Sequence, residues 1–168
     1  MRRLGLEAID LLQLHRVDPA VPLEDQVGEL KDLQDEGKIV AIGLSQVTVG
    51  QIERARRIAD IATVQNRYNV ADRGSAGVLD YCTRHGIGFI PWAPVAAGRL
   101  ARPGGPVDHI AATHGSTPSA AALSWLLHSS DVVLPIPGTS KVAHLEENLA
   151  ASRLRLSDAE LAELDAAA

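Results

Sequence analysis

Five short segments decide the fold, and they read IDLLQLHRVD (9–18), IGLSQV (42–47), VQNRYN (64–69), FIPWAP (89–94) and LPIPGTSKVAHLEEN (134–148). Each begins as an apolar, strand-like run and ends in polar or aromatic residues. Four of the five runs are followed within a few residues by a helical pattern. A repeated strand, loop and helix with polar residues after each strand is typical of a (β/α) barrel, which builds its site at the C-terminal ends of its strands.

Length and composition narrow this interpretation. The chain has 168 residues, of which 46% are hydrophobic and 22% charged, as in soluble globular proteins. A complete eight-stranded barrel needs about 250 residues. The sequence therefore predicts one α/β domain over residues 1–168, a partial (β/α)8 TIM barrel of about five strand–helix units plus a C-terminal helix. The chain therefore falls short of a complete barrel by roughly three strand–helix units.

Composition also excludes several classes of function. No apolar run approaches the roughly 20 residues that a membrane-spanning helix needs, and no signal peptide is recognisable. The single cysteine fits a reducing cytoplasm. A net charge of −5 without a cluster of Lys and Arg disfavours a nucleic-acid-binding surface. We therefore expect a cytoplasmic protein that binds neither nucleic acid nor membrane.

The spacing of apolar residues predicts the individual elements. Parallel strands are expected at residues 9–14, 39–44, 61–65, 88–91 and 132–136. Capping boxes at Thr48 and Gln51 and at Ser157 and Glu160 mark two helix starts, and Pro118 marks a third. The helical patterns cover about residues 23–33, 48–59, 75–85, 108–114, 117–128 and 141–150, and a last one follows Ser157.

The segment Gly138-Thr139-Ser140-Lys141 lies directly before a predicted helix. A helix N-terminus presents unpaired N–H groups and positive partial charge to an anion. The loop after the last strand of a barrel is also a frequent phosphate site. Hydroxyl donors on Thr139 and Ser140 and the charge of Lys141 add to this, so the segment predicts a phosphate site. A simple N-cap role for Ser140 is the alternative.

As a set, the five segments resemble the aldo-keto reductase family from about Leu4 to Ala167, which corresponds to the family's barrel from its fourth strand to its end. The resemblance implies reversible reduction of a small-molecule aldehyde or ketone with NADP(H). The family's tyrosine acid and its aspartate and lysine partners come from the first three strands. No residue here is assigned those roles, so the chain alone is expected to be inactive or weakly active.

The resemblance also implies roles near the reacting atoms. His15 would donate or orient a hydrogen bond at the substrate carbonyl, where negative charge develops, while packing at a strand end is the alternative. Ser45 and Gln65 would bind the nicotinamide carboxamide, and Gln46 stands where the family commonly has asparagine. Trp92 would lie against the nicotinamide ring, with core packing as the alternative.

The rest of the implied coenzyme site lies in the C-terminal half. Residues 138–141, before the helix, would bind the adenosine 2′-phosphate, which favours NADP over NAD. Glu147 and Asn148 would contact the adenine. Gly98 would let the backbone pass close to the pyrophosphate. The residues concerned are Gly98, Gly138, Thr139, Ser140, Lys141, His144, Glu147 and Asn148.

Other functions stay open at this point. One is a non-catalytic NADP-binding or protein-interaction module derived from the same fold, and another is a different (β/α) barrel enzyme that binds a phosphorylated sugar. The histidines show no metal-ligand spacing, so no metal site is expected. An open sheet would expose strand edges, which predicts self-association.

Overall fold

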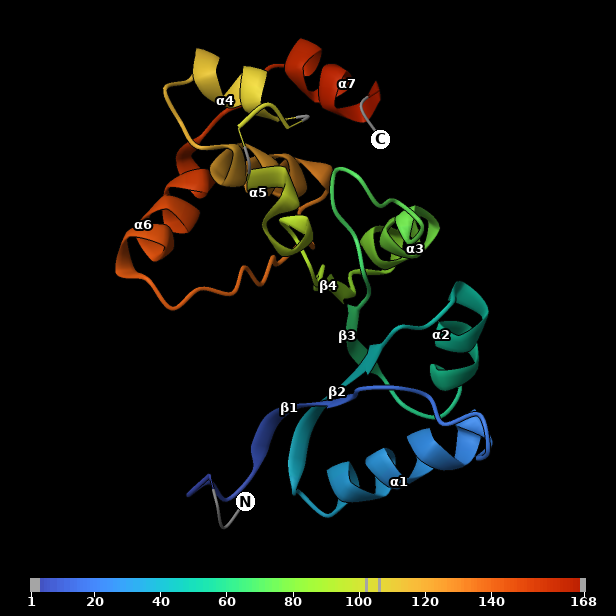
Figure 1. The fold of residues 1–168 in the computed structure, drawn as a ribbon. Coiled ribbons are helices and arrows are strands. Elements are labelled where there is room, and N and C mark those ends of the chain that lie inside the picture. Colours follow the sequence, from blue (N-terminus) through green and yellow to red (C-terminus); the bar gives the residue numbers. More distant parts are fainter. Residues whose placement is uncertain (1–3, 102, 106, 167–168) are drawn as a thin grey trace. The chain divides into compact units, whose positions relative to one another are not determined.

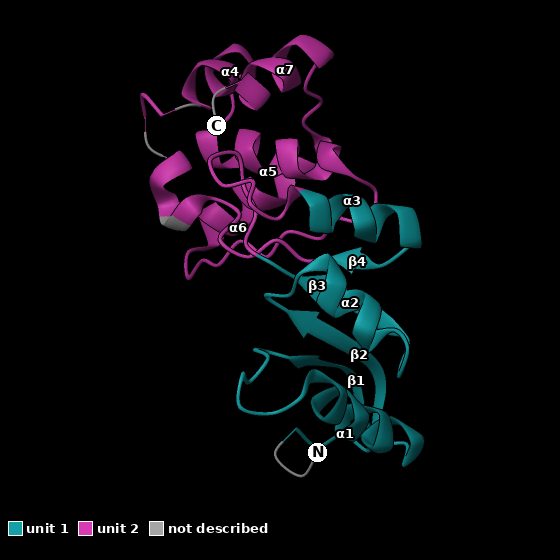
Figure 2. Cartoon of the chain, turned by 90° about the vertical axis from the view of Figure 1, so that its right-hand side faces the viewer, with its two compact units in different colours: residues 1–66, 77–89 teal, residues 67–76, 90–168 magenta. Residues whose placement is uncertain are grey.

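The computed structural model describes residues 4–101, 103–105 and 107–166 and shows an α/β fold of short parallel strands and helices (Figure 1). The chain divides into two compact units (Figure 2). Unit 1 comprises residues 1–66 and 77–89, and unit 2 comprises residues 67–76 and 90–168.

Unit 1 is built on a parallel sheet of four strands in the order β1-β2-β3-β4. Helices connect consecutive strands and lie on the same side of the sheet, as right-handed crossovers require (Figures 1 and 2). The strands are β1 (Ile9–Leu14), β2 (Ile39–Ser45), β3 (Ile61–Gln65) and β4 (Gly88–Phe89), and the helices are α1 (Leu23–Asp35), α2 (Val49–Ala55) and α3 (Ala76–His85).

Local sequence signals set the ends of these helices. Thr48 caps α2 and forms the expected capping box with Gln51. Gly37 follows α1 with a φ of 73°, which only glycine adopts without strain, and Gly86 follows α3 with a φ of 64°. The first three predicted strands and these three helices are therefore confirmed to within a few residues, α2 ending a turn earlier than expected.

The core of unit 1 lies between the sheet and its helices. Cys82 in α3 is fully buried there, and burial raises the pKa of its thiol to about 11. The main side chains that fill this layer are Leu23, Val27 and Leu30 of α1, Ile42 and Leu44 of β2, Ile52 of α2, Val64 of β3, Leu79 of α3 and Phe89 of β4.

The prediction of a fifth strand at 132–136 is wrong. Among the described residues of this segment, Val133 forms an isolated bridge and none belongs to a strand. Pro135 and Pro137 have no N–H to donate to a ladder, which explains why a strand-like apolar run stays open chain. The predicted strand 88–91 shortens to Gly88–Phe89 near Pro91 for the same reason.

Unit 2 is helical and is organised around α5 (Pro118–Ser129), which Thr117 caps as predicted and whose residues 120–126 are all buried. Helix α5 packs against several of the elements that surround it in the chain. These neighbours and the remaining helices of the unit are η1 (Ala96–Ala101), α4 (Asp108–Thr113), α6 (Val142–Ala150), η2 (Ala151–Arg153) and α7 (Asp158–Ala166).

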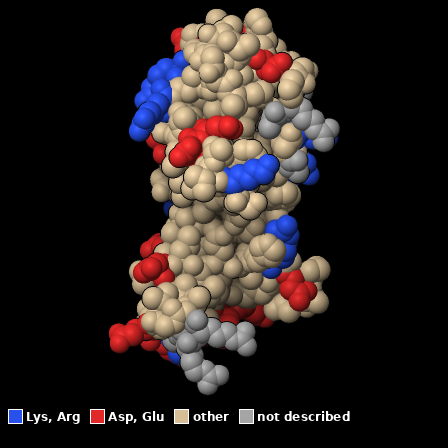
Figure 3. All heavy atoms as spheres, turned by 60° about the vertical axis from the view of Figure 1, so that its left-hand side comes forward, with Lys and Arg blue, Asp and Glu red and all other residues tan. Residues whose placement is uncertain are grey.

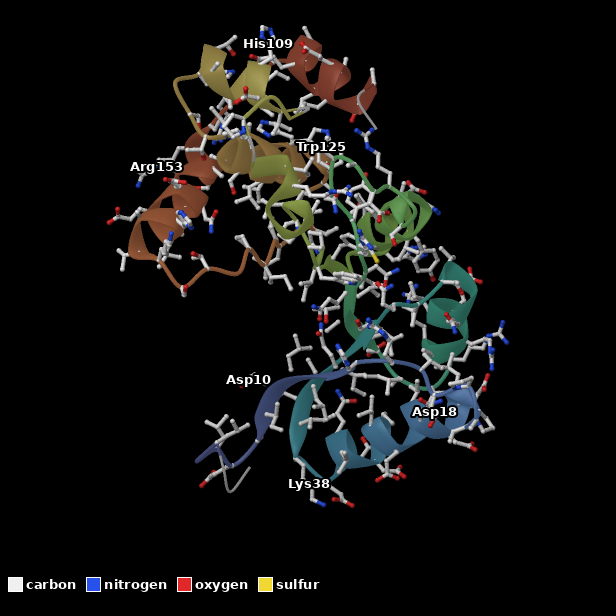
Figure 4. All side chains as sticks on the ribbon, in the orientation of Figure 1. Asp10, Asp18, Lys38, His109, Trp125 and Arg153 are labelled. Carbon is white, nitrogen blue, oxygen red and sulfur yellow. The ribbon has the colours of Figure 1, made fainter. Side chains whose placement is uncertain are left out.

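A cluster of buried aromatic and partly exposed charged side chains holds the C-terminal helix in place within unit 2. Trp125 of α5, labelled in Figure 4, donates from Nε1 to Asp165 over 3.0 Å and stacks on Tyr68. The Arg73 guanidinium lies over the Trp125 ring and donates to the carbonyl oxygens of Leu164 and Asp165 at the end of α7. A cation at a helix C-terminus is stabilising.

The surface carries both signs of charge. On the face that Figure 3 shows, Lys and Arg side chains and Asp and Glu side chains are interspersed between wide uncharged areas. No helix in the described ranges is long and apolar enough to cross a bilayer.

Candidate functional site

The sheet register of unit 1 brings three of the proposed site residues to one edge. Leu14 pairs with Leu44 and Ser45 pairs with Gln65, so His15, Ser45 and Gln65 follow one another at the C-terminal ends of β1, β2 and β3. His15 is exposed, and Gln65 is half-buried. This is the edge at which parallel α/β sheets collect functional side chains.

Two residues before these strand ends, Gln13 and Thr63 form a polar row on the face of the sheet away from the helices. Gln13 donates from Nε2 to Thr63 Oγ1 over 3.0 Å, passing across Gly43. A Cβ at Gly43 would lie 2.4 Å from Thr63 Oγ1 and 2.7 Å from Gln13 Cγ. Glycine is therefore required here by close approach, and because side chains alternate along a strand, Ser45 and Gln65 share the face of this row.

The Ser45 hydroxyl is almost fully enclosed, with 2% of the residue exposed. It donates to the backbone oxygen of Gln65 over 2.9 Å and accepts from Arg16 Nη1 over 3.3 Å. Since a hydroxyl has one proton, what remains for a ligand is a lone pair, which suits the N–H of a carboxamide. Arg16 is a further candidate residue that sequence reasoning missed, although a cation directly after His15 is a visible signal.

The residue after Ser45 has an unusual backbone conformation. Gln46 has a φ of 54°, in the left-handed region, and its N–H donates to the Gln65 oxygen over 3.0 Å. Asparagine tolerates this conformation better than glutamine. Asn66, also missed from sequence, is buried and pairs through its side-chain amide with both backbone groups of Val47. The loop after β2 is thus fixed to the end of β3.

Unit 2 contains a cavity of about 680 Å³ that gathers much of the implied coenzyme site. Six of the eight C-terminal positions line it: Gly98, Gly138, Thr139, His144, Glu147 and Asn148. The walls are completed by residues 93–95, the start of α5 at 117–119, and residues 136–137. Ser140 and Lys141 are exposed and do not line this cavity.

The beginning of α6 forms one end of the cavity. Thr139 Oγ1 accepts from the Lys141 N–H over 3.1 Å and lies 3.4 Å from His144 Nδ1. Lys141, not Ser140, is the N-cap residue, and its side chain makes no capping bond, so the simple cap role considered for Ser140 is wrong. The first-turn N–H groups of α6 are thus left for an anion.

The opposite wall shows unusual backbone conformations. Gly98 has a φ of 84°, and nothing lies within 4 Å of the position its Cβ would take, so a ligand can approach the backbone closely. Ala93 and Ala96 have φ values of 55° and 48°, which strain a non-glycine residue. Asn69 supports this turn by donating to the Ala93 oxygen over 3.0 Å.

Trp92 precedes this wall and is only half-buried, unlike Trp125. The Arg67 guanidinium lies 5.4 Å from the centroid of the Trp92 ring and forms an ion pair with Asp72 at 2.9 Å. Arg67 and Trp92 also share an isolated parallel bridge. The ring is therefore held by a cation–π contact rather than by full burial in a core.

Other polar candidates do not form a site. Asp10 lies on β1 and Asp18 in the loop before α1, well apart in Figure 4, so they are not a carboxylate pair. Burial raises the pKa of Tyr68, which stacks on Trp125. In the described ranges, no group of three or more His, Cys, Asp or Glu side chains could hold a metal ion.

Comparisons with known proteins agree with this architecture. The model of the Aldo/keto reductase family matches residues 1–168. An uncharacterised oxidoreductase of Schizosaccharomyces pombe is 49% identical over 165 residues, which are 98% of this chain and 54% of that protein. The chain spans 54% to 59% of the length of the curated relatives that it matches.

Solved structures give the same result. A thermostable aldo-keto reductase, Tm1743, crystallised with the inhibitor epalrestat, superposes with a TM-score of 0.92 at 30% identity, over 99% of this chain and 62% of that one. An aldo/keto reductase from Klebsiella pneumoniae in complex with NADP and acetate gives 0.85 at 34% identity, over 98% and 60%.

Proposed function

Because the chain belongs to the aldo/keto reductase family, we propose that it forms the C-terminal part of an NADPH-dependent aldo-keto reductase, which reduces aldehydes and ketones reversibly to alcohols. In this account the chain supplies the coenzyme-binding residues and one substrate-facing histidine. The acid that protonates the product comes from a part of the barrel outside this chain. The protein is proposed to act in the cytoplasm on small-molecule carbonyl compounds.

The observation that carries this proposal is the cavity of unit 2. The Thr139 hydroxyl and the His144 imidazole line it at the start of α6, and Gly98 leaves room for a close approach to the backbone. Further along α6, the polar side chains of Glu147 and Asn148 also line it. A phosphate fits the helix end, since unpaired N–H groups and Lys141 would neutralise its charge. Glu147 and Asn148 offer acceptors and donors to an adenine. The NADP complex of the Klebsiella pneumoniae relative supports the same assignment.

At the strand ends of unit 1, the side chains suit the nicotinamide group of the coenzyme. The Ser45 lone pair and the Gln65 amide can hold a carboxamide without adding charge near the hydride. Trp92 offers an aromatic plane for a nicotinamide ring. His15, exposed beside Ser45 on the sheet edge, would place an imidazole donor where negative charge develops on the carbonyl oxygen.

Binding and turnover should separate in this chain. Titrating NADPH should quench the tryptophan emission of the 168-residue chain, because the coenzyme lies against Trp92, and a Trp92→Phe variant should lose most of the quenching. Adding 4-nitrobenzaldehyde should produce almost no NADPH oxidation, since general acid catalysis is worth 10²–10⁴-fold. Turnover near 1 s⁻¹, within the usual enzyme range, would show that another residue supplies the proton. Absence of quenching would remove the coenzyme assignment.

A further inference from the structure

Arg16 occupies a position at the proposed reaction centre that no part of the coenzyme assignment uses. It follows His15 directly, where β1 ends. One nitrogen, Nη1, donates to the backbone oxygen of His15 over 2.8 Å and to Ser45 Oγ over 3.3 Å. These two acceptors, one on β1 and one on β2, fix the guanidinium at the same sheet edge as His15 and Ser45.

The rest of the Arg16 guanidinium has no protein partner among the described residues. Its Nε and Nη2 N–H groups make no hydrogen bond in that part of the chain, and no described carboxylate forms an ion pair with it. Two other arginines of unit 1 differ, because Arg54 pairs with Glu24 and Arg84 pairs with Asp80. A planar fork with fixed position and free donors matches the two oxygens of a carboxylate or phosphate.

We propose that Arg16 is a specificity-determining residue that binds an anionic group on the substrate, so that the preferred carbonyl compounds carry a carboxylate or a phosphate. This inference rests on the proposed function for the identity of the carbonyl substrate. Arg16 touches the serine proposed to hold the nicotinamide carboxamide, which is the uncharged end of the coenzyme. An anion bound there would lie beside the carbonyl that accepts the hydride.

The substrate is favoured over the coenzyme as the source of the anion. The cavity of unit 2 already offers Thr139 and His144 at the start of α6 to coenzyme phosphates, and Lys141 of the same segment adds positive charge. Within the described residues, the hydrogen bonds of the Arg16 side chain go instead to the His15 backbone oxygen and to Ser45 Oγ. Because Arg16 is exposed, its attraction for an anion is expected to weaken as salt concentration rises.

The test compares alcohol products that differ only in charge. The Kd values of 4-(hydroxymethyl)benzoate and its neutral isostere 4-(hydroxymethyl)benzamide are measured on the 15N-labelled chain, with and without NADP⁺, by following the Arg16 Nε–H resonance and the backbone amides near Ser45. The parent chain should bind the acid about tenfold more tightly than the amide, as for a hydrogen bond between charged groups. The corresponding phenyl phosphate separates a phosphate preference from a carboxylate preference.

Variants decide whether Arg16 is responsible. Arg16→Met should remove the preference for the acid, Arg16→Lys should retain part of it, and the matched control Arg57→Met should leave it unchanged, each variant being checked for a native melting curve. Equal affinity for acid and amide in the parent, or an unchanged preference in Arg16→Met, would overturn the proposal. So would weaker NADPH binding by Arg16→Met, which would assign the residue to the coenzyme. An Arg16-dependent preference without any NADPH binding would instead keep the anion site and reject the proposed function.

Discussion

At the scale of single residues, Gly43 is the position where the sheet tolerates least change. Gly43→Ala would place a Cβ 2.4 Å from Thr63 Oγ1, whose β-branched side chain has few alternative rotamers. We expect the variant to lose about 1–3 kcal/mol of stability, as overpacked sites do. Gly77→Ala, at an α3 position with open space around it, is the control. Equal denaturation midpoints for the two variants would mean that the polar row adjusts freely.

Sequence motifs predict several residues of the candidate site, because they mark strand ends that lie next to each other in a parallel sheet. Ser45 and Gln65 are proposed through the family resemblance, and the register shows that they are paired neighbours. Arg16 and Asn66 were missed, since their importance depends on contacts across strands rather than on spacing along the chain. Such contacts become visible only once the strands are in register.

At the scale of elements, we expect helix α7 to unfold locally at acid pH. Hydrogen bonds from the Ser157 backbone and hydroxyl, together with His114 of the segment after α4, lower the pKa of Glu160 from 4.5 to about 2. A carboxylate whose pKa is lower in the folded than in the unfolded chain stabilises the fold at pH values above its unfolded pKa. For Glu160 this stabilisation is lost as the pH falls from about 4.5 towards 2.

Hydrogen exchange of the α7 amides checks this prediction. In the parent chain, their protection should drop across that acid range, whereas Glu160→Gln should show lower protection near neutral pH and a smaller drop in acid. Glu163→Gln, a substitution at an exposed position of the same helix, is the control and should behave as the parent does. Identical acid profiles for the parent and Glu160→Gln would contradict the assigned role of this carboxylate.

The same scale shows where sequence patterns succeed and fail for the fold. Apolar runs followed by helical patterns predict β1, β2 and β3 with their helices, and for α2 a capping box adds local hydrogen bonds that act in the same direction as burial. The run at 132–136 is equally apolar, but two prolines in residues 134–137 remove the donors that a ladder needs. Apolarity alone therefore overestimates strands in proline-containing segments.

At the scale of the whole molecule, the exposed apolar side chains predict association. Val142, Leu145 and Leu149 repeat at helical spacing on α6 and are exposed, and Leu134 and Ile136 before this helix are exposed as well. β1 is in addition an edge strand of the sheet. The chain alone should therefore dimerise or form larger species at micromolar concentration, as exposed apolar patches do.

Light scattering tests this expectation. A Leu145→Lys, Leu149→Lys double variant should shift the chain towards monomer, whereas Val21→Lys, in an exposed loop of unit 1, should not. A sharp monomeric species for the parent chain, with cooperative thermal unfolding, would rule out association through α6.

We propose above all that this chain binds NADP(H) through the segment before α6. The most direct test measures, by titration calorimetry, the affinity of the chain for NADPH and for NADH. The 2′-phosphate carries close to two negative charges, so Lys141 and the α6 N-terminus should favour NADPH by about 1–3 kcal/mol. Lys141→Ala should narrow that preference for NADPH while NADH affinity stays nearly unchanged. The control Lys38→Ala, at the residue directly before β2 in unit 1, should leave the preference for NADPH unchanged. Equal affinity of the parent chain for NADPH and NADH would contradict the account.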